Sequence, residues 1–262
     1  MNRGLSQWAK VLTESGFEDQ ALHLSEDKQA SINRLRKLNL PHFDYKSGST
    51  SDFIANPNSF FSELNSREFY VTLIPDDQHE ERPRRVCPGR EAVLDYVTGF
   101  TENRDSNIKY ENMILMETAR MHYGANIVVD GGPGNPIYAE LVKGTHSDLV
   151  GDHAPIALTM HRSIETGSLI RFVRRDVTDD LGEKVVFDHD EEIVRHAMFS
   201  ALMLLPHTAV EEYHSPDYAL SETLFEPGYF ELGIIDSNDN SRLDVRFIDC
   251  SVDPIFIPSR TF

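Results

Sequence analysis

The chain has 262 residues, of which 40% are apolar and 26% charged, and its 25 Lys and Arg against 43 Asp and Glu give a formal net charge of −18. Phosphates of nucleic acids and anionic membrane surfaces repel so acidic a protein, which excludes both as general partners. The longest apolar run, AMFSALMLLP, is well short of the roughly 20 residues that a membrane-spanning helix needs. We therefore expect a soluble protein.

The N-terminal sequence and the cysteines both indicate a cytoplasmic protein. MNRGLSQWAKVLTESGFEDQ has no apolar core followed by a small-residue cleavage site, so it is not typical of a signal peptide. Cys87 and Cys250 are too few for a disulfide framework, and no CxxC spacing indicates a zinc or redox site. Both are expected to be structural thiols.

The first part of the chain alternates helices and strands. Apolar spacing predicts helical structure over residues 5–38, which Pro41 ends. Asn56 as N-cap and Pro57 at the first helical position predict a short helix. EFYVTLIP predicts a strand that ends at Pro75, followed by a polar loop and a helix over REAVLDYVTGF.

The second part of the chain is dominated by short strands. From Met113 to about Arg174, five apolar segments are separated by Gly, Pro, Asn and Asp clusters, which predicts an antiparallel meander. Asp188 as N-cap and Glu191 as its capping-box partner predict the start of the helix HDEEIVRHAMFSALMLLP. GYFELGII and LDVRFIDCS are predicted to form a C-terminal hairpin.

This segregation of helices and strands predicts an α+β fold built on antiparallel sheet, not a doubly wound parallel one. No GxGxxG or GxxxxGK[ST] motif follows a strand. The glycine cluster GGPGNP lies between strand-like segments, which favours a hairpin turn over a phosphate cradle.

Two acidic residues of the C-terminal hairpin are candidate metal ligands. Glu231 and Asp249 each interrupt an apolar run on neighbouring strands, and buried carboxylates need a cation or a metal. Mg²⁺ prefers one or two carboxylates together with water and phosphate oxygens. The alternative is that strand alternation points both side chains to solvent.

Cationic side chains offer candidate phosphate contacts. Arg82, Arg84, Arg85 and Arg90 are clustered in an otherwise acidic chain, and guanidinium groups hold phosphate oxygens bidentately. The alternative is that some of them neutralise the preceding acidic segment DDQHEE.

A polar segment further along the chain is a second candidate for binding. ELVKGTHSDLVGDHAPIAL places Glu140, Lys143, His146 and His153 among small residues, where they serve either binding or solubility. The histidines show no HExxH or HxxxH spacing, which would put two imidazoles on one helical face, and this disfavours a histidine-based metal site. The absence of GxSxG likewise disfavours a serine hydrolase.

In this order, the segments resemble the ATP-grasp superfamily, and in particular the nucleotide-binding domain of phosphoenolpyruvate synthase and pyruvate phosphate dikinase. LNLPHFDY resembles the entry to the domain, FYVTLIP a strand that usually ends in lysine before proline, and ILMETARMHYGANIVVD the hinge strand. YAELVKGTHSDLVGDHAP is similar to the following acidic strand and glycine turn, and GYFELGII with VRFIDCS to the terminal metal-binding strands.

The resemblance implies an ATP-grasp-like α+β fold, in which two α/β lobes with antiparallel sheets bind Mg²⁺ and ATP. It implies an N-terminal helical extension over 1–37, a first lobe over 38–112 and a second lobe over 113–262. Glu231 and Asp249 would hold the metal. Arg82, Arg84 and Lys143 would act on the phosphates, while Glu117, Glu140 and Arg85 would contact the nucleotide.

The implied function is transfer of a phosphoryl group, or activation of a carboxylate as an acyl phosphate, on a small-molecule substrate. Ile74 stands where the family has its phosphate-binding lysine, so a non-catalytic nucleotide sensor or assembly subunit is the alternative. Both the enzyme and the non-catalytic relative are compatible with a homo-oligomer or with a partner subunit. A third interpretation is an acidic interaction protein without ligand, in which FEPGYF contributes to a contact surface.

Overall fold

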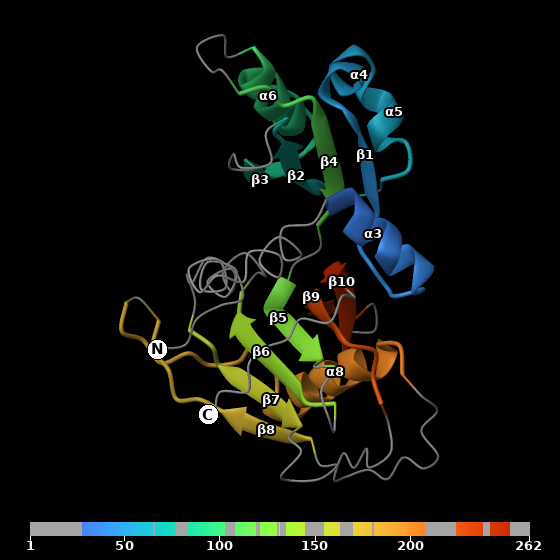
Figure 1. Ribbon diagram of the computed structural model, residues 1–262. Helices are drawn as coiled ribbons and strands as arrows, with labels where there is room; N and C mark the ends of the chain where they lie inside the picture. The colour runs from blue at the N-terminus through green and yellow to red at the C-terminus, as the bar shows by residue number, and fades with distance from the viewer. Residues whose placement is uncertain are drawn as a thin grey trace. The chain divides into compact units, whose positions relative to one another are not determined.

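A computed structural model describes residues 28–64, 66–76, 83–102, 108–118, 121–129, 131, 135–144, 155–162, 170–179, 181–207, 224–237 and 242–251 (Figure 1). They form two compact units. The small unit lies within Phe43–Arg120, and the large unit joins described residues of Met1–His42 to those of Met121–Phe262. The large unit is therefore discontinuous in sequence.

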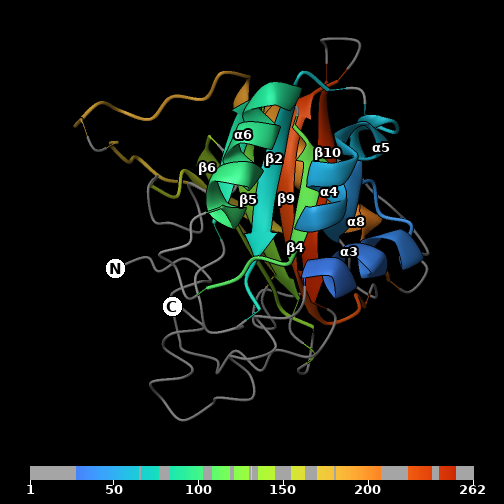
Figure 2. The same cartoon turned by 90° about the horizontal axis from the view of Figure 1, so that it is seen from above.

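The small unit is a four-stranded antiparallel sheet in the order β1-β4-β2-β3. Its strands are β1 (Tyr45–Ser49), β2 (Glu68–Ile74), β3 (Arg84–Pro88) and β4 (Asn112–Glu117). Its helices are α4 (Thr50–Ala55), α5 (Pro57–Phe61) and α6 (Arg90–Thr101), and α4 and α6 lie over the sheet in Figure 2.

Strand alternation gives the small unit one apolar and one mixed face. Phe69, Val71 and Leu73 of β2 are fully buried against the helices, in a cluster that includes Phe61 and Val97. The T-shaped contact between Phe53 and Phe60, with ring centroids 5.3 Å apart, joins α4 to α5 in the same cluster. The helices therefore cover a single face of the sheet.

Local capping explains where the short helices of the small unit begin. The Ser49 hydroxyl accepts the backbone N–H of Asp52 at 3.0 Å and caps α4. Asn56 is the N-cap of α5 and Pro57 its first residue, as predicted, although the Asn56 side chain makes no capping hydrogen bond.

The large unit is a six-stranded antiparallel sheet in the order β10-β9-β5-β6-β7-β8. Its strands are β5 (Met121–Val129), β6 (Ile137–Lys143), β7 (Leu158–Arg162), β8 (Arg171–Arg174), β9 (Gly228–Asp236) and β10 (Leu243–Ser251). Its helices are α3 (Lys28–Lys37) and α8 (Glu191–Leu204). The predicted five-stranded meander is confirmed for its last four strands, β5 to β8, whereas its first strand, β4, belongs to the sheet of the small unit. Strands β9 and β10 are the predicted C-terminal pair.

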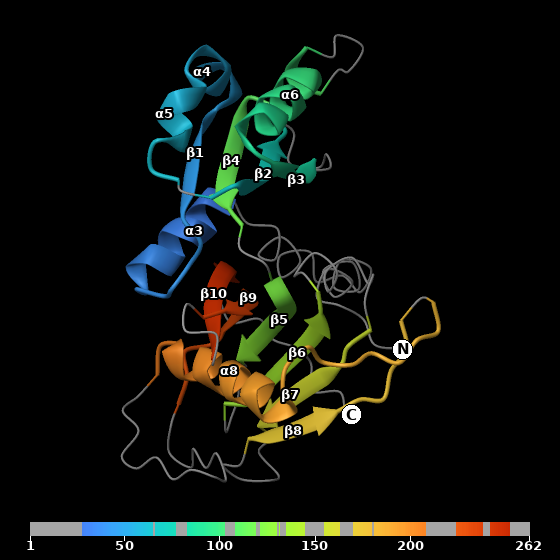
Figure 3. The same cartoon turned by 180° about the vertical axis from the view of Figure 1, so that it is seen from behind.

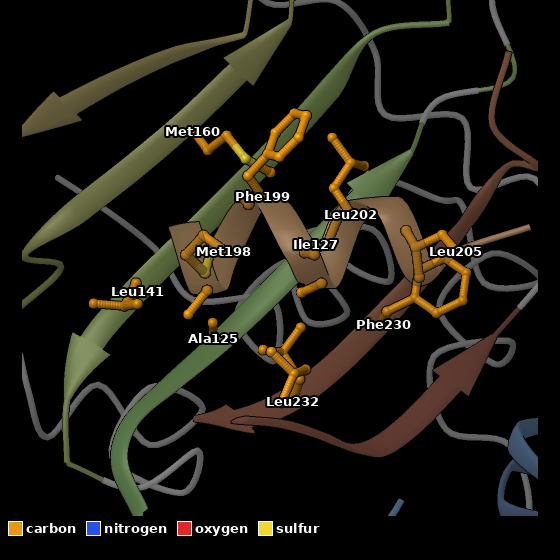
Figure 4. Close-up of a cluster of buried hydrophobic side chains, with 14 of the residues drawn as sticks. Ala125, Ile127, Leu141, Met160, Met198, Phe199, Leu202, Leu205, Phe230 and Leu232 are labelled. Atoms are coloured by element: carbon orange, nitrogen blue, oxygen red, sulfur yellow. The ribbon is translucent and has the colours of Figure 1, made fainter. Parts of the chain in front are cut away.

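Helix α8 covers one face of this large sheet (Figure 3). Met198, Phe199 and Leu202 of the helix meet Ile127 and Leu232 of the strands in one buried cluster, which Figure 4 shows from close by. The helix begins at Glu191, and the Asp190 carboxylate accepts the N–H of Glu192 at 2.9 Å. Asp190 is thus the N-cap, and the prediction of Asp188 was wrong by two residues because two aspartates precede the helix.

The observed fold is α+β with two antiparallel sheets, which confirms the predicted fold class. Two polar strands, β1 and β3, were not predicted, and β3 lies in the segment interpreted as a loop. The structure places β4 between β1 and β2, so the units divide near residues 42 and 120 rather than after 37 and 112. Among the described helices none has the length and apolarity to cross a membrane.

Candidate functional site

A row of polar side chains crosses the large sheet at one level. Asp249 of β10 pairs with Glu231 of β9, which pairs with Asn126 of β5. Asn126 pairs in turn with Glu140 of β6, and Glu140 with Thr159 of β7. Directly paired residues of an antiparallel sheet project to the same side. Five strands thus contribute one aligned polar row.

This polar row lies on the face of the sheet opposite α8. The neighbours of the row, Ala125, Leu141, Phe230 and Leu232, belong to the α8 core, and side chains alternate along each strand. A bulge between Phe247 and Asp249 shifts the register of β10 by one residue. In a regular strand Phe247 and Asp249, two residues apart, would project from the same face. Because of the extra residue, Phe247 faces the core and Asp249 projects from the polar face.

The Tyr229 hydroxyl contacts the two residues at the centre of the row. Its hydroxyl lies 2.7 Å from Glu231 Oε1 and 3.1 Å from Asn126 Oδ1. Burial raises the pKa of Tyr229 well above its ordinary value, and the negative charges of Glu231, Asp249 and Glu140 raise it further. Three carboxylates of the row therefore surround one neutral hydroxyl donor.

A second tyrosine orients Glu140 in the same way. Tyr138 donates its hydroxyl to Glu140 Oε1 at 2.6 Å, and burial followed by the Glu140 charge raises the Tyr138 pKa. The Tyr138 ring packs on the His161 imidazole at 5.0 Å between centroids, and His161 Nε2 lies 2.9 Å from Thr159 Oγ1. Burial, and then the Arg175 charge, lowers the His161 pKa, so the imidazole favours its neutral form.

Asp249 is anchored from the side of α3. The buried Ser31 hydroxyl donates to Asp249 Oδ1 and accepts the backbone N–H of Cys250 at 2.9 Å. A carboxylate that accepts one hydrogen bond retains lone pairs on its second oxygen with which to bind a cation. Cys250 and Cys87 are both buried free thiols, as predicted.

The donor set of the row suits a hard divalent cation. Glu231, Asp249 and Glu140 supply carboxylate oxygens and Asn126 an amide oxygen, which are the ligands that Mg²⁺ takes in proteins. Three negative charges on one sheet face also repel one another unless a cation lies among them. Glu231 and Asp249, on directly paired strands, thus have the chemistry of a magnesium site, whereas Glu140 lies two strands from Glu231.

Three arginines of the large unit share the face of the polar row. Arg246 pairs with Gly233, which lies two residues beyond Glu231 on the same face. Arg171 pairs with His161, and Arg175 is close enough to Tyr138 and His161 to shift both of their pKa values downward. Arg246, on β10, lies at the edge of the sheet that carries Asp249, whereas Arg171, on β8, lies at the opposite edge, so one anion cannot contact both.

Lys143 lies on the other face of the sheet. It is three residues from Glu140 on β6, and it pairs with Tyr123, which belongs to the α8 core. Its Nζ lies 2.6 Å from Asp188 Oδ1 and donates to the Val186 carbonyl at 3.0 Å. Lys143 therefore projects from the face opposite Glu140 and the rest of the polar row.

The expected arginines fall in the small unit and separate there. Arg82 lies outside the described residues. Arg84 pairs with Thr72 and so shares a face with Ile74, opposite the helices, whereas Arg85 pairs with Val71 on the helix-covered face. The Arg85 guanidinium lies 5.8 Å from the centroid of the Tyr96 ring of α6. Of the two, Arg84 is the one that shares a face with Ile74.

Glu117 has a structural role at the end of β4. Its Oε1 accepts the backbone N–H of Ser66 at 3.0 Å, and its own N–H donates to the Asp44 carbonyl at 2.8 Å. These contacts join the ends of β1, β2 and β4 within the small unit. The expected contact of Glu117 with adenine stays a prediction.

No family model and no curated protein matches the chain. Matching solved structures include the D-alanine–D-alanine ligase from Coxiella burnetii, with 8% identity, coverage of 89% of this chain and 49% of that one, and a TM-score of 0.39. The VanG D-Ala:D-Ser ligase from Enterococcus faecalis has 8% identity, coverage of 90% and 55%, and a TM-score of 0.41.

A RimK domain protein from Sphaerobacter thermophilus DSM 20745, named as ATP-grasp, also matches, with 9% identity, coverage of 97% of this chain and 70% of that one, and a TM-score of 0.43. The chain spans about half the length of the two matched ligases.

Proposed function

We propose that this protein is an ATP-grasp-like protein that binds Mg·ATP and transfers a phosphoryl group, or activates a carboxylate as an acyl phosphate. The observation that carries the proposal is the aligned row of Asp249, Glu231, Asn126 and Glu140. Its oxygen donors match Mg²⁺, and an Mg²⁺ ion in an acidic protein recruits phosphate oxygens to complete its coordination. The finer resemblance to phosphoenolpyruvate synthase and pyruvate phosphate dikinase rests on the short sequence motifs alone.

In this proposal Glu231 and Asp249 are the principal metal ligands. Tyr229 orients Glu231, and Ser31 orients Asp249, so that both carboxylates are held before the nucleotide arrives. Bound Mg²⁺ neutralises charge that develops on the transferred phosphoryl group. The side chains of the protein would hold the phosphates in the geometry that the transfer requires and would prevent the phosphates from binding in other geometries.

The cations proposed to contact the phosphates differ from those expected. Arg246 and the pair Arg171 and Arg175 share the face of the row, whereas Lys143 lies on the opposite face. Arg84 and Ile74 project from the same face of the small sheet, and the expected action of Arg84 on the phosphates stays a prediction. Arg85 projects from the other face.

Isothermal titration with ATP and Mg²⁺ tests the proposal. We expect binding by the wild-type chain and a loss of at least tenfold in affinity, about 1.4 kcal/mol, for Glu231→Gln and Asp249→Asn. Glu192→Gln is the matched control, since it removes one carboxylate from the exposed surface of α8. Absence of heat at millimolar nucleotide, or unchanged affinity in both site variants, would refute magnesium-dependent binding at the row.

The non-catalytic alternative is favoured by Ile74 at the end of β2. It predicts that ATP binds without release of ADP or phosphate across a panel of carboxylate and amine acceptors. Any release of ADP that depends on an acceptor eliminates this alternative and supports the enzyme.

A further inference from the structure

A second cluster of metal-ligating side chains lies in the large unit, on elements far apart in the sequence. His122 stands near the start of β5, His189 precedes α8, and Asp236 ends β9. One ligand atom from each lies within 4.8 Å of the other two. None of the three belongs to the polar row.

The two imidazoles converge on the two oxygens of one carboxylate. His122 Nε2 lies 2.8 Å from Asp236 Oδ2, and His189 Nε2 lies 3.4 Å from Asp236 Oδ1. The rings are nearly perpendicular, at 87°, with centroids 4.7 Å apart. Around a tetrahedral metal with bonds of about 2.0–2.1 Å, neighbouring ligand atoms are about 3.3 Å apart. The two nitrogen–oxygen distances, 2.8 and 3.4 Å, lie close to this spacing, and all three ligand atoms lie within 4.8 Å of one another.

The other nitrogen of each imidazole has its own partner. His122 Nδ1 lies 3.7 Å from Asp188 Oδ2, and His189 Nδ1 lies 3.2 Å from the Tyr123 hydroxyl. Metal-binding histidines commonly engage their second nitrogen with a carboxylate or another polar group, which fixes the ring and its tautomer. Asp188 is held in turn by Lys143, whose hydrogen bond is the main reason that the Asp188 pKa is lowered.

We propose that His122, His189 and Asp236 bind a divalent metal of the zinc class, with water as the fourth ligand. Two imidazoles and one carboxylate match the preference of Zn²⁺, Co²⁺ and Ni²⁺, whereas Mg²⁺ prefers oxygen ligands alone. The polar row and this cluster thus select different metals. The proposal does not depend on nucleotide binding.

Metal binding changes the positions of protons within the cluster. Without metal, the Tyr123 hydroxyl oxygen accepts the N–H groups of Asp188 and His189, so its proton is directed to His189 Nδ1. Both Nε2 atoms then carry the protons that face Asp236. Coordination through Nε2 displaces these protons and leaves each neutral ring with its proton on Nδ1. The Nδ1 proton of His122 then faces Asp188.

Titration of the full chain with Zn²⁺, and with Co²⁺ followed by visible absorption, tests the site. We expect one equivalent to bind with the intense absorption of tetrahedral Co²⁺, and we expect this equivalent to be lost in His189→Gln and Asp236→Asn. His196→Gln is the matched control, because His196 makes an exposed pair with Glu192 on α8. Asp188→Asn, which leaves the three ligands in place and changes a partner of His122, should weaken binding about 10–100-fold.

Two further measurements separate this site from the row and from effects on folding. Glu231→Gln should keep the zinc equivalent, and His189→Gln should keep binding of Mg·ATP. In long-range ¹H–¹⁵N spectra of the wild-type protein, Zn²⁺ should move the proton from Nε2 to Nδ1 in two histidines. Absence of zinc binding at micromolar metal, retention of the equivalent in both ligand variants, or unchanged histidine spectra would overturn the proposal.

Discussion

Replacing Tyr229 by phenylalanine removes one hydroxyl from the centre of the polar row and leaves the ring in place. The hydroxyl donates to Glu231 at 2.7 Å, and a hydrogen bond to a charged group contributes about 1.5–3 kcal/mol net. Glu231 is half-buried, so water can replace the lost donor at its carboxylate. We therefore expect the free energy of unfolding to fall by about 1.5 kcal/mol, the lower end of that range. Urea denaturation without nucleotide measures this loss.

The same substitution should weaken Mg·ATP binding, because the hydroxyl holds a proposed metal ligand in position. Changes at such orienting partners lower affinity about 10–100-fold. Since the Tyr229 pKa is raised, the hydroxyl keeps its proton throughout the neutral range, and the effect should not vary with pH there. Isothermal titration measures the affinity.

Tyr138→Phe is the matched control for this pair of measurements, since Tyr138 makes the corresponding bond to Glu140 at 2.6 Å. If Glu231 and Asp249 are the principal ligands, Tyr138→Phe should weaken binding less than Tyr229→Phe. A Tyr229→Phe protein that is destabilised but binds Mg·ATP as tightly as the wild type would show that the hydroxyl serves the fold alone, and would refute its role at the metal.

Three other substitutions give distinct expectations. Arg84→Ala should weaken nucleotide binding and Arg85→Ala should not, because they project from opposite faces of the small sheet; equal effects in titration calorimetry would contradict this. His161→Gln should flatten the pH dependence of unfolding. Folding lowers the His161 pKa, so the contribution of His161 to stability is present above the unfolded pKa of about 6.5 and is lost as pH falls through the folded pKa. If the free energy of unfolding changes with pH equally in both proteins, this expectation is wrong. Phe199→Ala should cost about 3–5 kcal/mol in urea denaturation by opening a cavity under α8, and a cost below 1 kcal/mol would contradict the observed packing.

The order and type of the main elements could be predicted from the sequence because their apolar residues follow the period of a helix or a strand. The polar strands β1 and β3 could not, since YKSGS and RRVCP lack that alternation and pair at the edges of a sheet. β1 pairs with β4, which lies far along the chain, whereas β3 pairs with the preceding strand β2.

The candidate sites show the same contrast. Glu231 and Asp249 could be predicted to lie side by side because they interrupt apolar strands that follow one another in sequence, and the structure pairs them directly. Asn126 could not be connected with them, because its place in the row depends on the register between β5 and β9. His122, His189 and Asp236 lie too far apart in sequence for any spacing rule to connect them, and only the folded sheet brings them together.

The interrupted course of the chain through the large unit affects the order in which the protein can fold during synthesis. The Pro41 carbonyl accepts the N–H of Phe247 at 2.7 Å, so the segment that begins with α3 gains its β10 contact only after β10 has been synthesised. The intervening small unit is continuous within Phe43–Arg120 and can complete its sheet much earlier. Ser31 reaches Asp249 only after that late closure, so a ribosome-bound chain carries one finished unit and a candidate metal site that is still incomplete.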